Sequence, residues 1–137
     1  MLLWLFFADS ILVGLAIVVA VVVYPAFREV GLHEWQRFHA HHSRMISFAV
    51  GPPWLLQGVL SGIWMLHGPH RLTAIAHGVF ALLGVLTTIG GAVPQHNQLS
   101  RDRTTTRLTR LQAWHLARTA AWLVATGLVA TAVAASH

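Results

Sequence analysis

The sequence predicts an all-α protein: a four-helix transmembrane bundle that forms a single domain over residues 1–137. Of the 137 residues, 55% are apolar and only 9% are charged, whereas a soluble domain carries about a quarter charged residues. After loops are subtracted, the length allows about four helices of the ~20 residues that cross a bilayer. We therefore expect lipid to surround most of the surface.

The first predicted span covers residues 2–24, an apolar run that contains Asp9. It lacks the basic start and small-residue cleavage site of a secretory signal peptide, so we expect the mature protein to retain it. Tyr24-Pro25 is expected to end the span and begin a polar connection. Within that connection, residues 32–43 predict an amphipathic, interfacial extension of the second helix.

The second predicted span covers residues 45–66 and should kink at the double proline of positions 52–53, where two backbone N–H groups are missing. The third covers residues 72–93 and is expected to stop at Pro94. The fourth runs over about residues 108–135. Small residues at every fourth position predict close helix contacts in the second and fourth spans; they are Gly58, Gly62, Ala113, Ala117, Ala121 and Ala125.

The arginines predict the orientation of the bundle. Seven lie in or beside the connections after the first and third spans, and only Arg71 lies between the second and third. The positive-inside rule places the arginine-rich connections in the cytoplasm and both termini outside. We expect a multi-pass protein of a bacterial inner (cytoplasmic) membrane.

The composition excludes several kinds of site. The chain has no cysteine, hence no disulfide, thiolate ligand or iron–sulfur cluster, and no lysine, hence no Schiff base. The arginines flank apolar segments instead of forming a solvated patch, so we expect no nucleic-acid partner. A P-loop, a Rossmann fingerprint and a serine nucleophile elbow are also missing.

Histidine carries the main functional signal, with ten residues in the chain. On a helix, His39 and His42 share one face, and His96 follows Pro94, which is expected to let its ring turn back into the bundle. Neutral imidazole binds iron, copper and zinc. We predict His39, His42 and His96 as metal ligands, and His115, in the fourth span, as a fourth ligand or proton shuttle. The alternative is a set of interfacial histidines that hydrogen-bond headgroups and loop carbonyls, as we expect for His41.

Two further polar positions lie within the spans. Arg118 has Trp114 and Trp122 one turn to either side, so its guanidinium either stacks on indole and reaches the surface or holds an anionic group inside the bundle. Asp9 should pair with His77 at the outer end, as a structural contact, a proton relay or a quinone contact. The other histidines assigned to that end are His67, His70 and His137.

Four short motifs follow one another along the chain: Tyr24-Pro25-Ala26-Phe27, His39-Ala40-His41-His42, Val93-Pro94-Gln95-His96-Asn97-Gln98-Leu99 and Trp114-His115-Leu116-Ala117-Arg118-Thr119. With them the chain resembles a family of small bacterial four-helix membrane proteins. It is more distantly similar to the anthrone-oxygenase-like membrane proteins, a resemblance that implies oxygenation of reduced polycyclic phenols. The residues that match the distant pattern are His96, Asn97, Trp114, His115 and Arg118.

These observations predict a membrane-embedded, metal- or haem-dependent oxidoreductase that acts on a hydrophobic small molecule arriving from the lipid bilayer. In this interpretation His115 and Arg118 are catalytic, Trp114 and Asn97 bind the cofactor or substrate, and the metal is iron or copper. The alternative is a non-enzymatic small transporter, or a haem- or metal-binding subunit of a larger complex. A homo-oligomer stays open, and copper export is disfavoured because methionines are few and cysteines absent.

Overall fold

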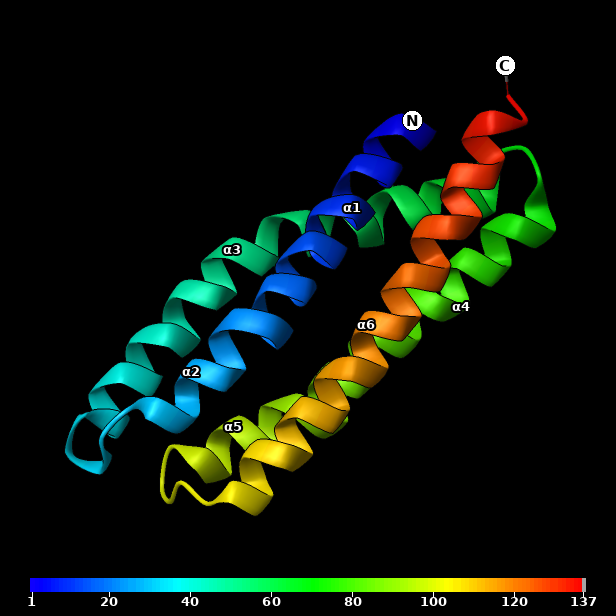
Figure 1. Cartoon of the computed structure of the whole chain (residues 1–137). Helices are drawn as coiled ribbons and strands as arrows, with labels where there is room; N and C mark the ends of the chain where they lie inside the picture. Colours follow the sequence, from blue (N-terminus) through cyan, green and yellow to red (C-terminus); the bar gives the residue numbers. More distant parts are fainter. Residues whose placement is uncertain (137) are drawn as a thin grey trace.

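The computed structural model describes residues 1–136 and confirms the all-α four-helix bundle (Figure 1). His137, which the sequence assigned to the outer end, lies outside the described residues. Four helical stretches are long and apolar enough to cross a membrane, and they cover Leu2–Glu29, Leu32–His67, Arg71–Leu99 and Thr105–Ala134. The chain is thus a multi-pass membrane protein, with many large apolar side chains on its outer surface where lipid can cover them.

Two of the four stretches are interrupted by a short π-helical segment. In chain order the elements are α1 (Leu2–Val18), η1 (Val19–Val23), α2 (Tyr24–Glu29), α3 (Leu32–His67), α4 (Arg71–Thr87), η2 (Thr88–Ala92), α5 (Val93–Leu99) and α6 (Thr105–Ala134).

The expected helix ends at Pro25 and Pro94 are wrong, because both helices continue past their proline. In each case a π-turn comes directly before it: the Tyr24 N–H binds the carbonyl of Val19, and the Val93 N–H binds that of Thr88. The wider turn moves the preceding carbonyls away from the proline ring, so the helix absorbs the missing N–H and goes on. The third helix therefore carries His96 on a regular helix, α5, instead of an unwound turn.

The amphipathic extension predicted before the second span is confirmed as the first part of one 36-residue helix, α3. The double proline at positions 52–53 lies inside this helix. Figure 1 shows α3 changing direction near its middle, as the predicted kink requires.

The four helices form an up-and-down bundle in which each one packs against two neighbours. The α3 helix packs on α1 and α4, and α6 packs on α1 and α4. Both termini lie at one end of the bundle, and the connections that contain α2, α5 and the start of α6 lie at the other (Figure 1). We call these the terminal end and the loop end.

The small-residue spacing predicted the close helix contacts only in part. Ala121 and Ala125 are buried, as predicted, but Ala113 and Ala117 are exposed, and a side chain at Gly58 or Gly62 would meet open space. Large residues decide the packing instead, because the indole of Trp122 lies directly over Gly84 of α4. A short repeat of small residues identifies positions that permit close approach, and the bulky partner decides which of them are used.

The loop end is closed by polar contacts around an aromatic cluster. The Trp35 indole donates to the carbonyl of Leu99 at 2.7 Å and ties the start of α3 to the end of α5. Arg103 donates to the carbonyls of Phe27 and Val30, each at 2.7 Å, where α2 ends, and its guanidinium lies 5.3 Å from the centre of the Trp35 ring. These contacts satisfy helix-end carbonyls that have no partner within their own helix.

Candidate functional site

A cavity of about 560 Å³ opens inside the loop-end half of the bundle. All four helical stretches contribute to its wall. Apolar side chains such as Leu12, Leu15 and Val50 line one part, while histidines, Arg118 and Ser43 line another. The cavity thus has an apolar body and a polar region, the combination that small-molecule sites in proteins commonly show.

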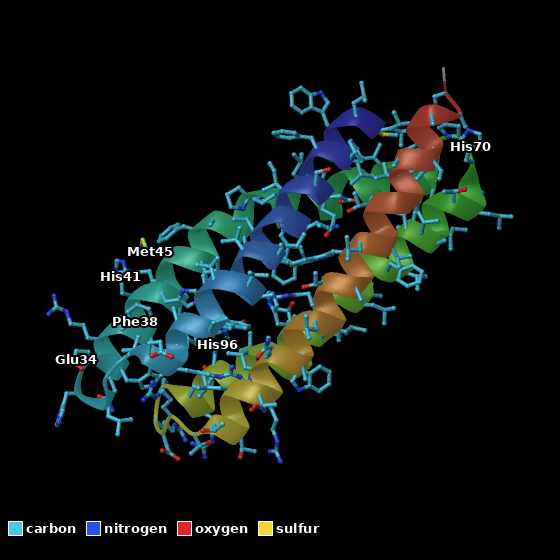
Figure 2. The ribbon with its side chains drawn as sticks, in the orientation of Figure 1. Glu34, Phe38, His41, Met45, His70 and His96 are labelled. Carbon is cyan, nitrogen blue, oxygen red and sulfur yellow. The ribbon has the colours of Figure 1, made fainter. Side chains whose placement is uncertain are left out.

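The three histidines that were predicted as metal ligands all line this cavity. His39 is buried and His42 is half-buried on the same face of α3, as their spacing predicted, whereas His41 is exposed. Figure 2 shows His41 on the outer side of α3 and His96 between the helices. We call His39, His42 and His96 the histidine cluster.

Two members of the cluster touch. The Nε2 atom of His39 and the Nδ1 atom of His96 lie 3.0 Å apart, and their ring centres are 5.2 Å apart. The ring of His42 is stacked with that of His96 at 6.3 Å between centres. Within residues 1–136, no group of three or more His, Asp or Glu side chains is placed to hold one metal ion. The structure therefore brings two candidate ligand atoms together, with the third ring beside them.

His115 and Arg118 form a second unit next to the cluster. His115 is fully buried. Its Nε2 atom lies 2.8 Å from the carbonyl oxygen of Ala16, and its Nδ1 atom lies 2.6 Å from the Nη2 atom of Arg118. A carbonyl only accepts and a guanidinium only donates, so Nε2 carries the proton and Nδ1 is the acceptor. Both ring nitrogens of His115 are thus engaged, and the ring holds Arg118 at the cavity wall. The roles predicted for His115, ligand or proton shuttle, stay predictions.

Trp114 and Asn97, the residues predicted to bind a cofactor or substrate, lie in different places. Asn97 lines the cavity. Trp114 is 41% exposed, and its ring lies over Gly91, so it is not among the described side chains that line the cavity. Two turns further along α6, Trp122 takes that place: it is 2% exposed, lines the cavity and stacks under the guanidinium of Arg118 at 5.1 Å.

Tyr24 is a site residue that the residue-by-residue reasoning did not single out. It is buried, lines the cavity and packs edge-on against His115, with ring centres 4.9 Å apart. A signal was present, because it is the only tyrosine in the chain and directly precedes Pro25 in an apolar run. Buried tyrosines usually need a partner for the hydroxyl, so a lone one inside a span indicates a polar neighbour.

Asp9 and His77 form the contact that the sequence predicted near the terminal end. Asp9 Oδ2 lies 2.8 Å from His77 Nε2, and Asp9 Oδ1 accepts from Gln57 Nε2 at 2.9 Å. The remaining ring nitrogen of His77 lies 3.0 Å from the Ser61 hydroxyl. All four side chains are at least 96% buried. We call Asp9, Gln57, Ser61 and His77 the Asp9 layer; it links α1, α3 and α4.

Comparisons with known proteins add no relative: no family model, no curated protein and no solved structure matches this chain. The function of this chain is therefore inferred from the geometry of its cavity.

Proposed function

We propose that this protein is a membrane-embedded oxidoreductase of the oxygenase type, which acts on a hydrophobic small molecule in the cavity and uses the histidine cluster as its chemical centre. The observation that carries the proposal is the contact between His39 Nε2 and His96 Nδ1, 3.0 Å apart on the wall of a largely apolar cavity. Inside a membrane, such polar groups are costly, and they characteristically occur at functional sites.

The distance between the two nitrogens fits a shared metal ion. Metal–imidazole bonds are about 2.0–2.1 Å long, so two ligands at an angle of roughly 90–110° place their nitrogens about 2.9–3.4 Å apart. The same 3.0 Å also fits an N–H···N hydrogen bond. A bis-histidine haem fits less well, because two axial nitrogens on opposite sides of one iron lie roughly 4 Å apart. In this proposal His39 and His96 would hold a directly bound iron or copper ion, and His42, whose ring is stacked with that of His96, would be the third ligand.

The proposed location is a bacterial inner membrane, with the loop end in the cytoplasm and both termini outside. The support is the distribution of arginines, because Arg28, Arg37, Arg44 and Arg101 all belong to segments at the loop end of the bundle. The histidine cluster then lies toward the cytoplasmic side. A hydrophobic substrate reaches the cavity from the bilayer.

A non-enzymatic role is the second candidate: a small transporter, or a haem- or metal-binding subunit of a larger complex. The transporter is favoured by one specific observation, the lack of a converged three-residue metal group within residues 1–136. In this case the contact between His39 and His96 is a hydrogen bond that shapes a binding cavity.

Metal content and the absorption spectrum of the detergent-purified protein separate the two candidates. We expect stoichiometric iron or copper in the wild type, and loss of most of it in His39→Ala, His42→Ala and His96→Ala. His41→Ala is the matched control, since this ring belongs to the same helical turn but lies on the outer side of α3. A Soret band would indicate haem instead. A metal-free wild type after growth with added iron and copper, or equal loss in His41→Ala, would contradict the proposed oxidoreductase.

A further inference from the structure

Arg118 is a cationic side chain in a transmembrane helix, yet it has no carboxylate partner within residues 1–136. Within residues 1–136, the carboxylates that contact a basic side chain are Asp9, which contacts His77, and Asp102, which contacts Arg107. No aspartate or glutamate is among the residues that line the cavity. A charge in this environment is costly unless something compensates it.

The guanidinium of Arg118 is held in place by hydrogen bonds that use only some of its N–H donors. One terminal nitrogen donates to His115 Nδ1 at 2.6 Å, and the other donates to the Thr88 hydroxyl at 3.3 Å. The Nε atom is buried and has no hydrogen-bond partner in the described chain. A guanidinium offers five N–H donors, so these two bonds leave several available. Because neutral partners hold Arg118, its positive charge stays uncompensated.

A second donor on the same wall is also without a partner. The Ser43 hydroxyl lines the cavity, and its oxygen is buried and has no hydrogen-bond partner within residues 1–136. The indole N–H of Trp122 also has no acceptor there, but its Nε1 atom lies against Gly84 of α4, which is not among the residues that line the cavity. A buried polar group that has no hydrogen-bond partner destabilises the free protein. Unpaired polar groups and an uncompensated cation on one wall favour the binding of a ligand that has negatively charged acceptor atoms.

The rest of the cavity determines what that negative group is attached to. Leu12, Leu15, Val50 and Trp54 line its apolar part. A small inorganic anion would leave these surfaces without a partner, whereas a hydrophobic body would cover them. The cavity volume of about 560 Å³ is in the range of small-molecule sites.

We infer that the cavity binds an amphipathic molecule with an anionic oxygen headgroup, a carboxylate or an ionised phenol, which Arg118 holds while the apolar body lies against α1 and the middle of α3. As the substrate class of the oxidoreductase, this inference rests on the proposed function, although binding itself does not require a metal. His115 then acts as a positioning residue that aims the guanidinium.

The test compares an acid with an alcohol of the same shape. Binding of 2-naphthoate and of 2-naphthalenemethanol to the full-length, detergent-purified protein is measured by isothermal titration calorimetry at pH 8. We expect 2-naphthoate to bind at least about 10-fold more tightly, the contribution expected of charge-assisted hydrogen bonds. Arg118→Gln should abolish this preference, and Arg118→Lys should keep part of it. Arg110→Gln, an exposed arginine two turns earlier on α6, is the control and should keep it in full.

Equal affinity of the wild type for acid and alcohol would overturn the inference, and so would an undiminished preference in Arg118→Gln. If Arg118→Gln fails to fold, the wild-type comparison and Arg118→Lys still decide. Competition in nanodiscs tests the headgroup: displacement of 2-naphthoate by phosphatidylglycerol but not by phosphatidylcholine would overturn the carboxylate or phenolate headgroup in favour of a phospholipid phosphate, and no displacement supports it. An acid preference in a metal-free protein would leave this inference standing while the oxidoreductase proposal fails.

Discussion

The Asp9 layer and the histidine cluster both contain buried histidines inside the bundle. Only in the Asp9 layer does every polar side-chain atom of the central pair have a hydrogen-bond partner. In the Asp9 layer, both carboxylate oxygens and both nitrogens of His77 have partners, and all four side chains are buried. Around the histidine cluster, a cavity of about 560 Å³ remains, and two polar groups on its wall, the Nε donor of Arg118 and the Ser43 hydroxyl, lack hydrogen-bond partners in the described chain.

This difference separates a structural polar network from a binding site. A network that satisfies every member joins helices and gains nothing from a ligand. A ligand that supplies acceptors forms hydrogen bonds with the unpaired donors of a cavity. In the free protein, those unpaired donors lower the free energy of unfolding. Four predictions test whether the two regions differ in this way.

Cysteine labelling tests the assignment of the two regions to opposite sides of the membrane, and it should give an all-or-none result. The chain has no cysteine of its own. His67 and Ser100 are exposed residues at the terminal end and the loop end, respectively. In intact cells, a membrane-impermeant thiol reagent should label His67→Cys and not Ser100→Cys. His67 is preferable to the adjacent Gly68, where a side chain would collide with Trp64. The reverse labelling would place the histidine cluster outside.

Asp9→Leu should cause the largest loss of stability, because it leaves both His77 and Gln57 without their buried acceptor. Removing one member of a buried pair costs about 3–5 kcal/mol, which should appear as a clearly lower melting temperature in detergent. Asp9→Asn should stay close to wild type, since its amide can accept from Gln57 and donate to a neutral His77 that moves its proton toward Ser61. Equal tolerance of both variants would show that the Asp9 layer is not a closed network.

Gly84→Ala should have an intermediate effect, because a Cβ atom there would collide with the indole of Trp122 and push it into the cavity. Overpacking of this kind costs about 1–3 kcal/mol. Gly58→Ala is the matched control: it is also a helical glycine, but its side chain would meet open space. We expect Gly58→Ala to be neutral or stabilising by up to about 1 kcal/mol. Melting temperatures of the two variants in the same detergent make the comparison.

His96→Ala should have the smallest effect on stability, about 1 kcal/mol or less, because it removes one hydrogen bond at a cavity wall. His77→Ala, the corresponding change in the Asp9 layer, should cost several times more, since it leaves Asp9 and Ser61 unpaired in a buried position. Thermal unfolding of the two variants checks the ratio. A loss at His96 as large as that at His77 would mean that the histidine cluster is a structural network too.

The sequence by itself determined the fold class, the number of spans and several contacts. Apolar stretches long enough to cross a bilayer predict transmembrane helices, because in lipid the backbone N–H and C=O groups must form their hydrogen bonds within the helix. The pairing of Asp9 with His77 was also predictable, since a buried carboxylate needs a partner and His77 lies at a similar depth. Helical periodicity likewise separated His39 and His42 from His41.

Only the tertiary structure decided where the helices continue, which small residues are used and what the cavity contains. The π-turns before Pro25 and Pro94 change the helical register, so the faces on which Tyr24 and His96 lie do not follow from a 3.6-residue period. Trp122, and not Trp114, reaches the cavity because Gly84 of α4 leaves space for its indole. The helix continuations and the packing of Trp122 depend on contacts between side chains from distant segments of the chain. A local sequence pattern does not predict those contacts.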